Sequence, residues 1–182
     1  DCCVAMSEFI AGSEEAFVQK MNNKAKALGL KNTKFQNATG LPVDDHYSTA
    51  YDMAMMGKEL LKYSSITKYT GKYESFLREN TEKKFWLVNT NRLVKFYPGV
   101  DGLKTGFTNE AKYCLTATAQ KDNMRVIAVV FGAENPKVRN AQVTKMLDYA
   151  FSQYTTHPVY KKNVELKKVM VSKGTEKTVA AV

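Results

Sequence analysis

Two apolar runs separated by a short polar stretch constrain the fold of this chain more than any other feature. Residues 113–120 and 124–132 are rich in valine, isoleucine, alanine and threonine, and Lys121-Asp122-Asn123 lies between them. Apolar runs of this length with a polar junction predict two antiparallel strands joined by a tight hairpin turn. Residues 102–107 predict a third strand. The pattern therefore favours an antiparallel sheet at the centre of the fold.

A helix is predicted directly after these strands. Asn135 is a suitable N-cap, and Pro136 suits the first turn of a helix that runs to about residue 154. The apolar residues that recur along its inner face are Val143, Leu147, Ala150 and Tyr154.

Three further helices are predicted before the sheet. The first covers residues 2–11, with Asp1 as its candidate N-cap, and the second starts after Ser13 and is ended by Gly29. The third follows Thr49, whose spacing to Asp52 resembles a capping box. The region 64–100 is less regular. It is expected to form short strands or turns at 69–71, 85–88 and 93–96, with Trp86 as a packing residue.

The candidate chemistry lies in the segment Asp101-Gly102-Leu103-Lys104-Thr105-Gly106-Phe107-Thr108. A Lys-Thr-Gly triplet recurs by chance, so its setting matters. Asn89-Thr90-Asn91-Arg92-Leu93 lies upstream, and two strand-like runs and an amphipathic helix lie downstream. This order resembles the C-terminal part of the catalytic domain of serine-type D-alanyl-D-alanine carboxypeptidases of the S11 type, the low-molecular-mass penicillin-binding proteins.

The resemblance implies an α+β chain that forms part of a β-lactamase/transpeptidase-like fold, with helices flanking an antiparallel sheet. It also implies a peptide substrate with an anionic terminal carboxylate and a carbonyl that becomes negatively charged on attack. Lys104 would be catalytic through its positive charge, and the backbone N–H of Phe107 would form half of an oxyanion hole. Substrate binding would fall to Thr105, Gly106, Thr108 and Arg139.

Each of these binding roles has a chemical reason within the resemblance. The Thr105 hydroxyl can donate to a carboxylate, and Gly106 lacks a Cβ, so a substrate backbone can lie against the strand. The planar fork of Arg139 suits the terminal carboxylate. The structural alternative for Arg139 is an ordinary exposed arginine near the first turn of a helix, where the macrodipole disfavours cations. Asn89 and Asn91 are candidates for the cleft wall, although amides that fix loops are commoner.

Two of the three motifs of this family are not found in their expected places. No Ser-x-Asn occurs, and the one Ser-x-x-Lys match, Ser65 to Lys68, follows the helix that should come after the Ser-x-Asn element. Ser65 is therefore interpreted as a chance match. The opening stretch from Asp1 to Gly12 resembles the helix that follows Ser-x-Asn in the family. The sequence is accordingly interpreted as a C-terminal fragment whose nucleophile lies upstream.

Two regions are predicted along the chain. Residues 1–154 are assigned to the C-terminal part of the catalytic domain. Residues 155–182 are assigned to the start of a small β-rich domain, because apolar and polar residues alternate at 164–171.

The formal net charge of +9, from 27 basic and 18 acidic residues, raises nucleic-acid binding as an alternative. The lysines are scattered, however, and are interpreted as a solvated surface suited to anionic cell-wall polymer or lipid headgroups. Cys2, Cys3 and Cys114 do not form a disulfide framework and are expected to be small buried residues. The longest apolar run, 126–131, is far shorter than the roughly 20 residues of a membrane span.

The resemblance also implies partners and a location. A peptidoglycan pentapeptide and β-lactam antibiotics are expected ligands, whereas no nucleic acid, metal or organic cofactor is expected. The strand at 124–132 is expected to pair with the missing N-terminal segment or with a second copy. An extracytoplasmic bacterial protein is expected, either secreted or associated with the cell membrane through elements outside this sequence.

Two alternative functions stay open at this point. A β-lactamase-like enzyme would share the Lys-Thr-Gly triplet, although the β segment after the last helix argues against it. A non-catalytic module that binds cell-wall peptide would suit the absence of a correctly ordered serine.

Overall fold

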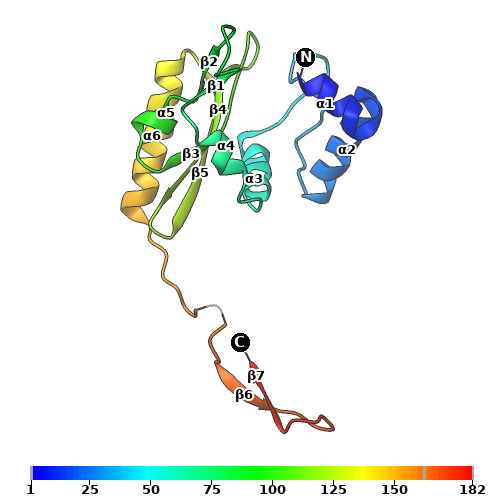
Figure 1. The fold of residues 1–182 in the computed structure, drawn as a ribbon, viewed down its shortest axis with the longest axis vertical. Coiled ribbons are helices and arrows are strands. Elements are labelled where there is room, and N and C mark those ends of the chain that lie inside the picture. The colour runs from blue at the N-terminus through cyan, green and yellow to red at the C-terminus, as the bar shows by residue number, and fades with distance from the viewer. Residues whose placement is uncertain (1, 162, 182) are drawn as a thin grey trace.

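A three-stranded antiparallel sheet forms the centre of the structure, a computed structural model that describes residues 2–161 and 163–181 (Figure 1). Its strands are β3 (Val100–Thr108), β4 (Lys112–Lys121) and β5 (Met124–Ala133), in the order β3-β4-β5. The tight turn predicted between β4 and β5 is confirmed, with Asp122 in the left-handed region at φ 51°. The α+β class is therefore confirmed.

Helix α6 (Pro136–Gln153) covers one face of this sheet. The predicted start is confirmed, because the Asn135 side chain accepts a hydrogen bond from the Val138 backbone N–H at 2.9 Å. Tyr154 was expected on the inner face, but it lies beyond the helix end and is exposed. The extended backbone at Tyr154 explains the difference, because it ends the helical spacing that would have turned the ring inward.

The main core lies between the sheet and α6. Each large apolar side chain buried there contributes roughly 1.5–3 kcal/mol. The buried residues shared by the two layers are Leu115, Ala117, Ala119, Ala128, Val130, Val143 and Leu147.

Helix α3 (Ala50–Leu60) covers the opposite face of the sheet. A Cβ added to Gly57 would lie 3.2 Å from Leu103 Cδ1 and 3.6 Å from Thr116 Cγ2. Thr116 alternates along β4 with Leu115 and Ala117, which face α6, so the two helices lie on different sides. Helices therefore flank the sheet, as the sequence predicts.

Helices α1 (Cys2–Ala11) and α2 (Glu14–Ala27) pack against each other and lie on the side of α3 that faces away from the sheet (Figure 1). Ser13 caps α2 by accepting from the Ala16 N–H at 3.1 Å, and Gly29 ends it at φ 72°, so both predicted boundaries are confirmed. Lys24 of α2 donates to Glu59 of α3 at 3.0 Å. The candidate N-cap Asp1 lies outside the described residues.

The loop between α2 and α3 is held by one buried carboxylate. Asp52, 2% exposed, accepts from the Asn32 backbone N–H at 2.9 Å and from the Thr33 hydroxyl at 2.7 Å. Thr49 caps α3 through the Asp52 N–H at 3.1 Å, as predicted. The capping-box expectation is only half right, because the Asp52 carboxylate binds this loop instead of returning to the helix start.

The irregular region contains more helix than expected. Its elements are α4 (Ile66–Thr70), β1 (Glu74–Leu77), β2 (Phe85–Val88) and α5 (Leu93–Phe96), and β1 pairs with β2 in a separate hairpin. The strand at 85–88 is confirmed, whereas 93–96 and most of 69–71 are helical. Trp86 is not a packing residue, because its side chain is 57% exposed and its indole N–H donates to Glu74 at 3.0 Å.

After α6 the chain extends away from the sheet and forms a two-stranded antiparallel hairpin (Figure 1). Its strands are β6 (Lys167–Met170) and β7 (Thr178–Ala181). This β structure agrees with the alternation in the sequence. The assignment of 1–154 and 155–182 to two domains stays a prediction.

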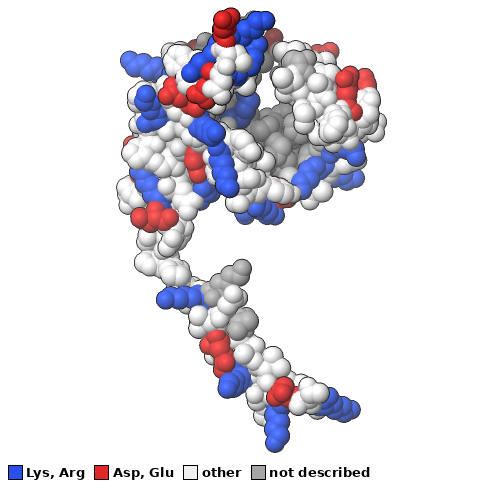
Figure 2. All heavy atoms as spheres, viewed as in Figure 1, with Lys and Arg blue, Asp and Glu red and all other residues white. Residues whose placement is uncertain are grey.

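The surface is mixed in charge. Figure 2 shows basic side chains spread over the visible face and interspersed with acidic ones. Cys2 and Cys3 are exposed and Cys114 is half-buried, so the expectation of three buried cysteines is wrong. Within the described residues, no helix is both long and apolar enough to cross a membrane.

We expect Asp52→Ala to destabilise the full-length protein by roughly 1–3 kcal/mol, because it leaves a backbone N–H and a hydroxyl without their acceptor. The free energy of unfolding in urea would measure this change. Asp45→Asn is the matched control, since Asp45 is exposed, pairs with Lys34 at 3.0 Å, and has a left-handed backbone (φ 63°) that asparagine tolerates. Loss of this ion pair should cost about 0–1 kcal/mol. Equal losses for the two variants would show that Asp52 does not hold the loop.

Candidate active-site strand

The Lys-Thr-Gly triplet lies on β3, which is an edge strand of the described sheet. β3 pairs with β4 on one side only, so alternate backbone groups on its other side have no strand partner there. Lys104 is exposed, and its ammonium donates to the Thr105 carbonyl oxygen at 2.6 Å. The strand therefore presents a cation beside an open backbone edge.

The half-buried Thr105 meets a second hydroxyl from another segment. Thr105 Oγ1 and Thr90 Oγ1 are 2.6 Å apart. Sequence reasoning did not single out Thr90. The signal that could have found it is its place between two asparagines, both of which bind backbone.

Asn89 and Asn91 fix the loop that carries Thr90. The Asn89 amide donates to the carbonyl oxygens of Thr70 at 3.0 Å and Lys72 at 2.9 Å. The Asn91 amide, in a residue only 1% exposed, donates to the Gly102 carbonyl oxygen at 3.1 Å. The loop-fixing interpretation of both residues is confirmed, and Asn91 ties the loop directly to β3.

Gly106 is not required by the packing of the described chain. A Cβ at this position would meet only Cys114 Cβ, at an ordinary 3.7 Å, and the backbone is not in the left-handed region. Gly102 on the same strand differs, because a Cβ there would lie 2.6 Å from Thr70 Oγ1. The fold explains Gly102, whereas the packing of the described chain does not require a glycine at position 106.

Phe107 and Thr108 follow the triplet; the first has an exposed ring, and the hydroxyl of the second stabilises a turn. The Phe107 side chain is 54% exposed, and its ring lies 4.4 Å from that of Tyr113. The Thr108 hydroxyl accepts from the Ala111 N–H at 2.9 Å and so closes the turn between β3 and β4. The Thr108 oxygen thus accepts one hydrogen bond within the fold, and no hydrogen bond among the described residues uses its hydroxyl hydrogen.

A bulge precedes the triplet and is anchored across the sheet. The pairing shifts between Val100 and Gly102, which leaves Asp101 as the extra residue. The Asp101 carboxylate receives two hydrogen bonds from the Arg125 guanidinium of β5, both at 2.8 Å. This ion pair crosses β4, so it links the start of β3 to β5 at the far edge of the sheet.

Arg139 is buried rather than exposed. It is 5% exposed in α6, and its Nε–H and Nη2–H groups donate to Asn140 Oδ1 at 3.1 and 3.0 Å. Burial lowers its pKa, while the nearby Cys114 and Tyr113 side chains act in the opposite direction. These two residues of β4 pair with Gly106 and Phe107, so Arg139 lies close to the part of β4 that adjoins the end of the triplet.

Arg139 has no carboxylate partner among the described residues. Its Nη1 also lacks a hydrogen-bond partner there, yet no buried side-chain nitrogen of the described chain is unsatisfied. Nη1 therefore keeps some solvent access. The alternative that Arg139 is an ordinary exposed arginine is therefore excluded. Its binding of a substrate carboxylate stays a prediction.

Ser65 does not have the surroundings expected of a catalytic serine. It is exposed, directly precedes α4 and makes no side-chain cap to that helix. The Lys68 backbone N–H donates to the Ser65 carbonyl oxygen at 3.2 Å, but no hydrogen bond of the described residues joins the Ser65 hydroxyl to the Lys68 ammonium. A serine nucleophile needs an adjacent base, so the interpretation as a chance match agrees with this geometry.

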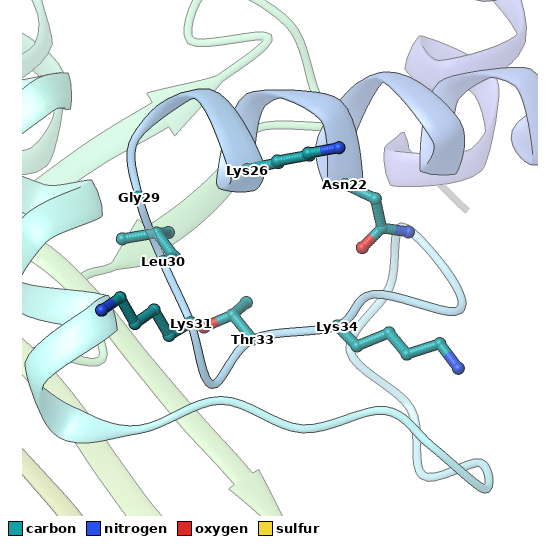
Figure 3. A pocket seen from close by; sticks show the side chains of 7 residues that line it. All are labelled: Asn22, Lys26, Gly29, Leu30, Lys31, Thr33 and Lys34. Carbon is teal, nitrogen blue, oxygen red and sulfur yellow. The ribbon is translucent and has the colours of Figure 1, made fainter.

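A cavity of about 520 Å³ lies elsewhere, at the end of α2 and in the loop that follows (Figure 3). None of its lining residues belongs to the triplet strand or to the Thr90 loop. They are Asn22, Lys26, Gly29, Leu30, Lys31, Thr33 and Lys34. In Figure 3 the Lys31 and Lys34 side chains point in different directions, so the cavity does not gather its charges on one point.

We expect Gly106→Ala to change the stability of the full-length protein by no more than about 0.5 kcal/mol, because its new methyl group meets no close neighbour. Gly102→Ala should cost roughly 1–3 kcal/mol through overpacking against Thr70. Thermal unfolding of both variants would measure the difference. A loss at Gly106 as large as at Gly102 would show that the fold itself requires Gly106.

Comparison with known proteins identifies the family. Residues 1–135 match the family model for D-alanyl-D-alanine carboxypeptidases, peptidase S11. The chain is 73% identical over 177 residues to D-alanyl-D-alanine carboxypeptidase DacF of Bacillus subtilis (strain 168), covering 97% of this chain and 46% of that protein. It is 39% identical over 161 residues to DacA of Escherichia coli (strain K12), covering 86% of this chain and 38% of that protein.

Solved structures show the same relationship. Penicillin-binding protein 5 from Haemophilus influenzae matches with a TM-score of 0.80 and 32% identity, over 97% of this chain and 51% of that chain. Penicillin-binding protein D2 from Listeria monocytogenes, in its ampicillin-bound form, matches with a TM-score of 0.73 and 34% identity, over 83% of this chain and 61% of that chain. The chain spans less than half of the curated relatives named above and somewhat more of these two structures. It belongs to the peptidase S11 family of D-alanyl-D-alanine carboxypeptidases.

Proposed function

We propose that the full-length protein is a serine-type D-alanyl-D-alanine carboxypeptidase that acts on peptidoglycan stem peptides, and that this chain supplies the Lys-Thr-Gly side of its active site. The observation that carries the proposal is the open edge of β3, where the exposed Lys104 and the Thr90–Thr105 hydroxyl pair lie beside a glycine that the fold does not need. Family membership supports the same reaction.

The reaction proceeds through an acyl-enzyme. A serine hydroxyl attacks the carbonyl carbon between the two D-alanines, and its proton is transferred through a base to the departing amine of the terminal D-alanine. Water then attacks the ester and releases the shortened peptide. The serine is expected in residues of the full-length protein that this sequence does not include, because no Ser-x-Asn occurs and the Ser65 hydroxyl is not hydrogen-bonded to a base among the described residues.

The residues of β3 bind and polarise the peptide. Lys104 supplies positive charge, and the Thr105 hydroxyl donates to the terminal carboxylate. The peptide backbone lies against the open edge at Gly106 as an added strand. The N–H of Phe107 stabilises the oxyanion, and the hydroxyl hydrogen of Thr108 is available for a second contact.

Arg139, near the part of β4 that pairs with Gly106 and Phe107, interacts with the terminal carboxylate. A guanidinium without a counter-ion in a largely dry position interacts strongly with an arriving anion. Its Nη1 group is the free donor for that contact.

β-Lactams are proposed as ligands of the same site, and an extracytoplasmic location follows from the substrate. The two solved structures described above are named as penicillin-binding proteins, and one of them has ampicillin bound. The net charge of +9 favours approach to anionic cell-wall polymer.

We expect Lys104→Ala to slow acylation of the full-length protein by a labelled penicillin by roughly 10²–10³-fold, as for the loss of one donor to a developing oxyanion. Unfolding should change little, because Lys104 is exposed. Lys145→Ala, at an exposed position of α6, is the control and should acylate normally. Ser65→Ala should also acylate normally, and loss of the adduct in that variant would make Ser65 the nucleophile. No adduct with the unmodified protein would favour the non-catalytic binding module.

We expect Arg139→Gln to weaken peptides with a free terminal carboxylate more than the same peptides with a terminal amide. The reason is that the guanidinium interacts with a charge that the amide lacks. Steady-state kinetics with both peptides would measure the ratio of kcat/KM values. Lys137→Gln, an exposed change in the first turn of the same helix, should leave that ratio unchanged. Equal losses on both peptides would reduce Arg139 to a packing role.

A further inference from the structure

We propose that Thr90 is a positioning residue for Thr105: its hydroxyl donates to Thr105 Oγ1 and so directs the Thr105 hydrogen to the substrate carboxylate. This inference rests on the proposed carboxypeptidase function. It assigns a role to a residue outside the Lys-Thr-Gly triplet. The observation is the 2.6 Å separation of the two hydroxyl oxygens.

The count of hydrogens decides the direction of this bond. Each threonine hydroxyl has one hydrogen and can accept through two lone pairs. If the Thr105 hydroxyl donated to Thr90, the only hydrogen of Thr105 would be used. A carboxylate approaching Thr105 would then meet only the lone pairs of its oxygen, which repel it. If Thr90 donates to Thr105, the Thr105 hydrogen is free for the carboxylate. An anionic ligand at Thr105 therefore selects Thr90 as the donor.

Hydrogen bonds of the residues on both sides of Thr90 hold it in place beside β3. Its backbone is flanked by Asn89, bound to the carbonyls of Thr70 and Lys72, and by Asn91, bound to the Gly102 carbonyl. The Asn91 N–H also donates to Asn89 Oδ1 at 2.9 Å, which links the two anchors. The anchor at Gly102 lies three residues before Thr105 on the same strand. Movement of the Thr90 loop relative to β3 would break that bond.

A second feature of Thr90 agrees with a role outside the core. Its side chain is exposed, whereas Asn91 beside it is 1% exposed. The fold thus buries the anchor and leaves the hydroxyl at the surface where β3 presents Thr105. Removing the Thr90 hydroxyl leaves the anchors intact.

A double-mutant cycle in the full-length protein tests the proposal. Hydrolysis of a peptide ending in D-Ala-D-Ala would be measured for the unmodified protein, Thr90→Val, Thr105→Val and the double variant. We expect Thr105→Val to lower kcat/KM roughly ten- to hundredfold, as for a hydrogen bond to a charged group, and Thr90→Val to lower it roughly three- to tenfold. The double variant should equal Thr105→Val alone, because Thr90 acts only through Thr105.

Three further measurements separate positioning from a structural role. Thr90→Ser keeps the hydroxyl and should restore kcat/KM to within about twofold of the unmodified protein. The loss in Thr90→Val should disappear with the amidated peptide, which lacks the anionic carboxylate. Thr81→Val, a surface change at a threonine that donates to the Arg78 carbonyl at 3.0 Å, is the control and should leave both peptides unaffected.

Several results would overturn the proposal. One is a Thr90→Val loss of the same size in the Thr105→Val background, since Thr90 would then act on its own. Another is an unchanged kcat/KM in Thr90→Val or in Thr105→Val. In each of these cases the unmodified protein is active, so the proposed function stands. An unmodified protein that neither hydrolyses the peptide nor binds penicillin would instead refute the proposed function and this inference with it.

Discussion

The register of β3 against β4 decides where every group of the candidate site lies. Gly106 pairs with Cys114 and Thr105 pairs with Leu115, a residue with no exposed surface. Because β4 is packed between α6 and α3, its position is fixed, and so is the position of β3, which pairs with it. Lys104 and Thr105 are consecutive in β3 and point to opposite faces, and a slip of one residue would move each side chain to the face that it does not now occupy. The core is thus the reason that an edge strand can carry an ordered site.

Polar side chains hold the irregular segments where the sheet cannot. Asn89 and Asn91 place the loop before α5, and Asp52 places the loop before α3. The Thr70 hydroxyl donates to the Asp101 carbonyl oxygen at 2.7 Å and so docks α4 on the bulge. Each of these groups binds backbone across a long separation in sequence. Buried polar groups of this kind favour one arrangement of the loops, because unpaired alternatives are costly.

The elements with local signals could be predicted from the sequence, and those that depend on tertiary contacts could not. Ser13, Gly29, Asn135 and the Asp122 turn mark boundaries through their own conformations, so α2, α6 and the β4–β5 hairpin were predictable. Helix α5 was missed, because a single turn gives no periodic pattern and is held by the Asn91 side chain, which accepts from the Leu93 N–H at 3.2 Å. The burial of Arg139 and the position of Thr90 depend on neighbours that are distant in the chain. The triplet strand itself was predictable, because residue type and motif order coincide there.

The two edges of the central sheet differ in character. The β5 edge is strongly apolar, with valine, isoleucine and phenylalanine along its length, while the β3 edge carries an exposed lysine. Charged residues, lysine above all, discourage edge strands from pairing with strands of other copies. Lys104 therefore makes the open edge of β3 unfavourable for pairing with a strand of another copy, and under the proposed function the carboxylate of a short peptide would compensate its charge.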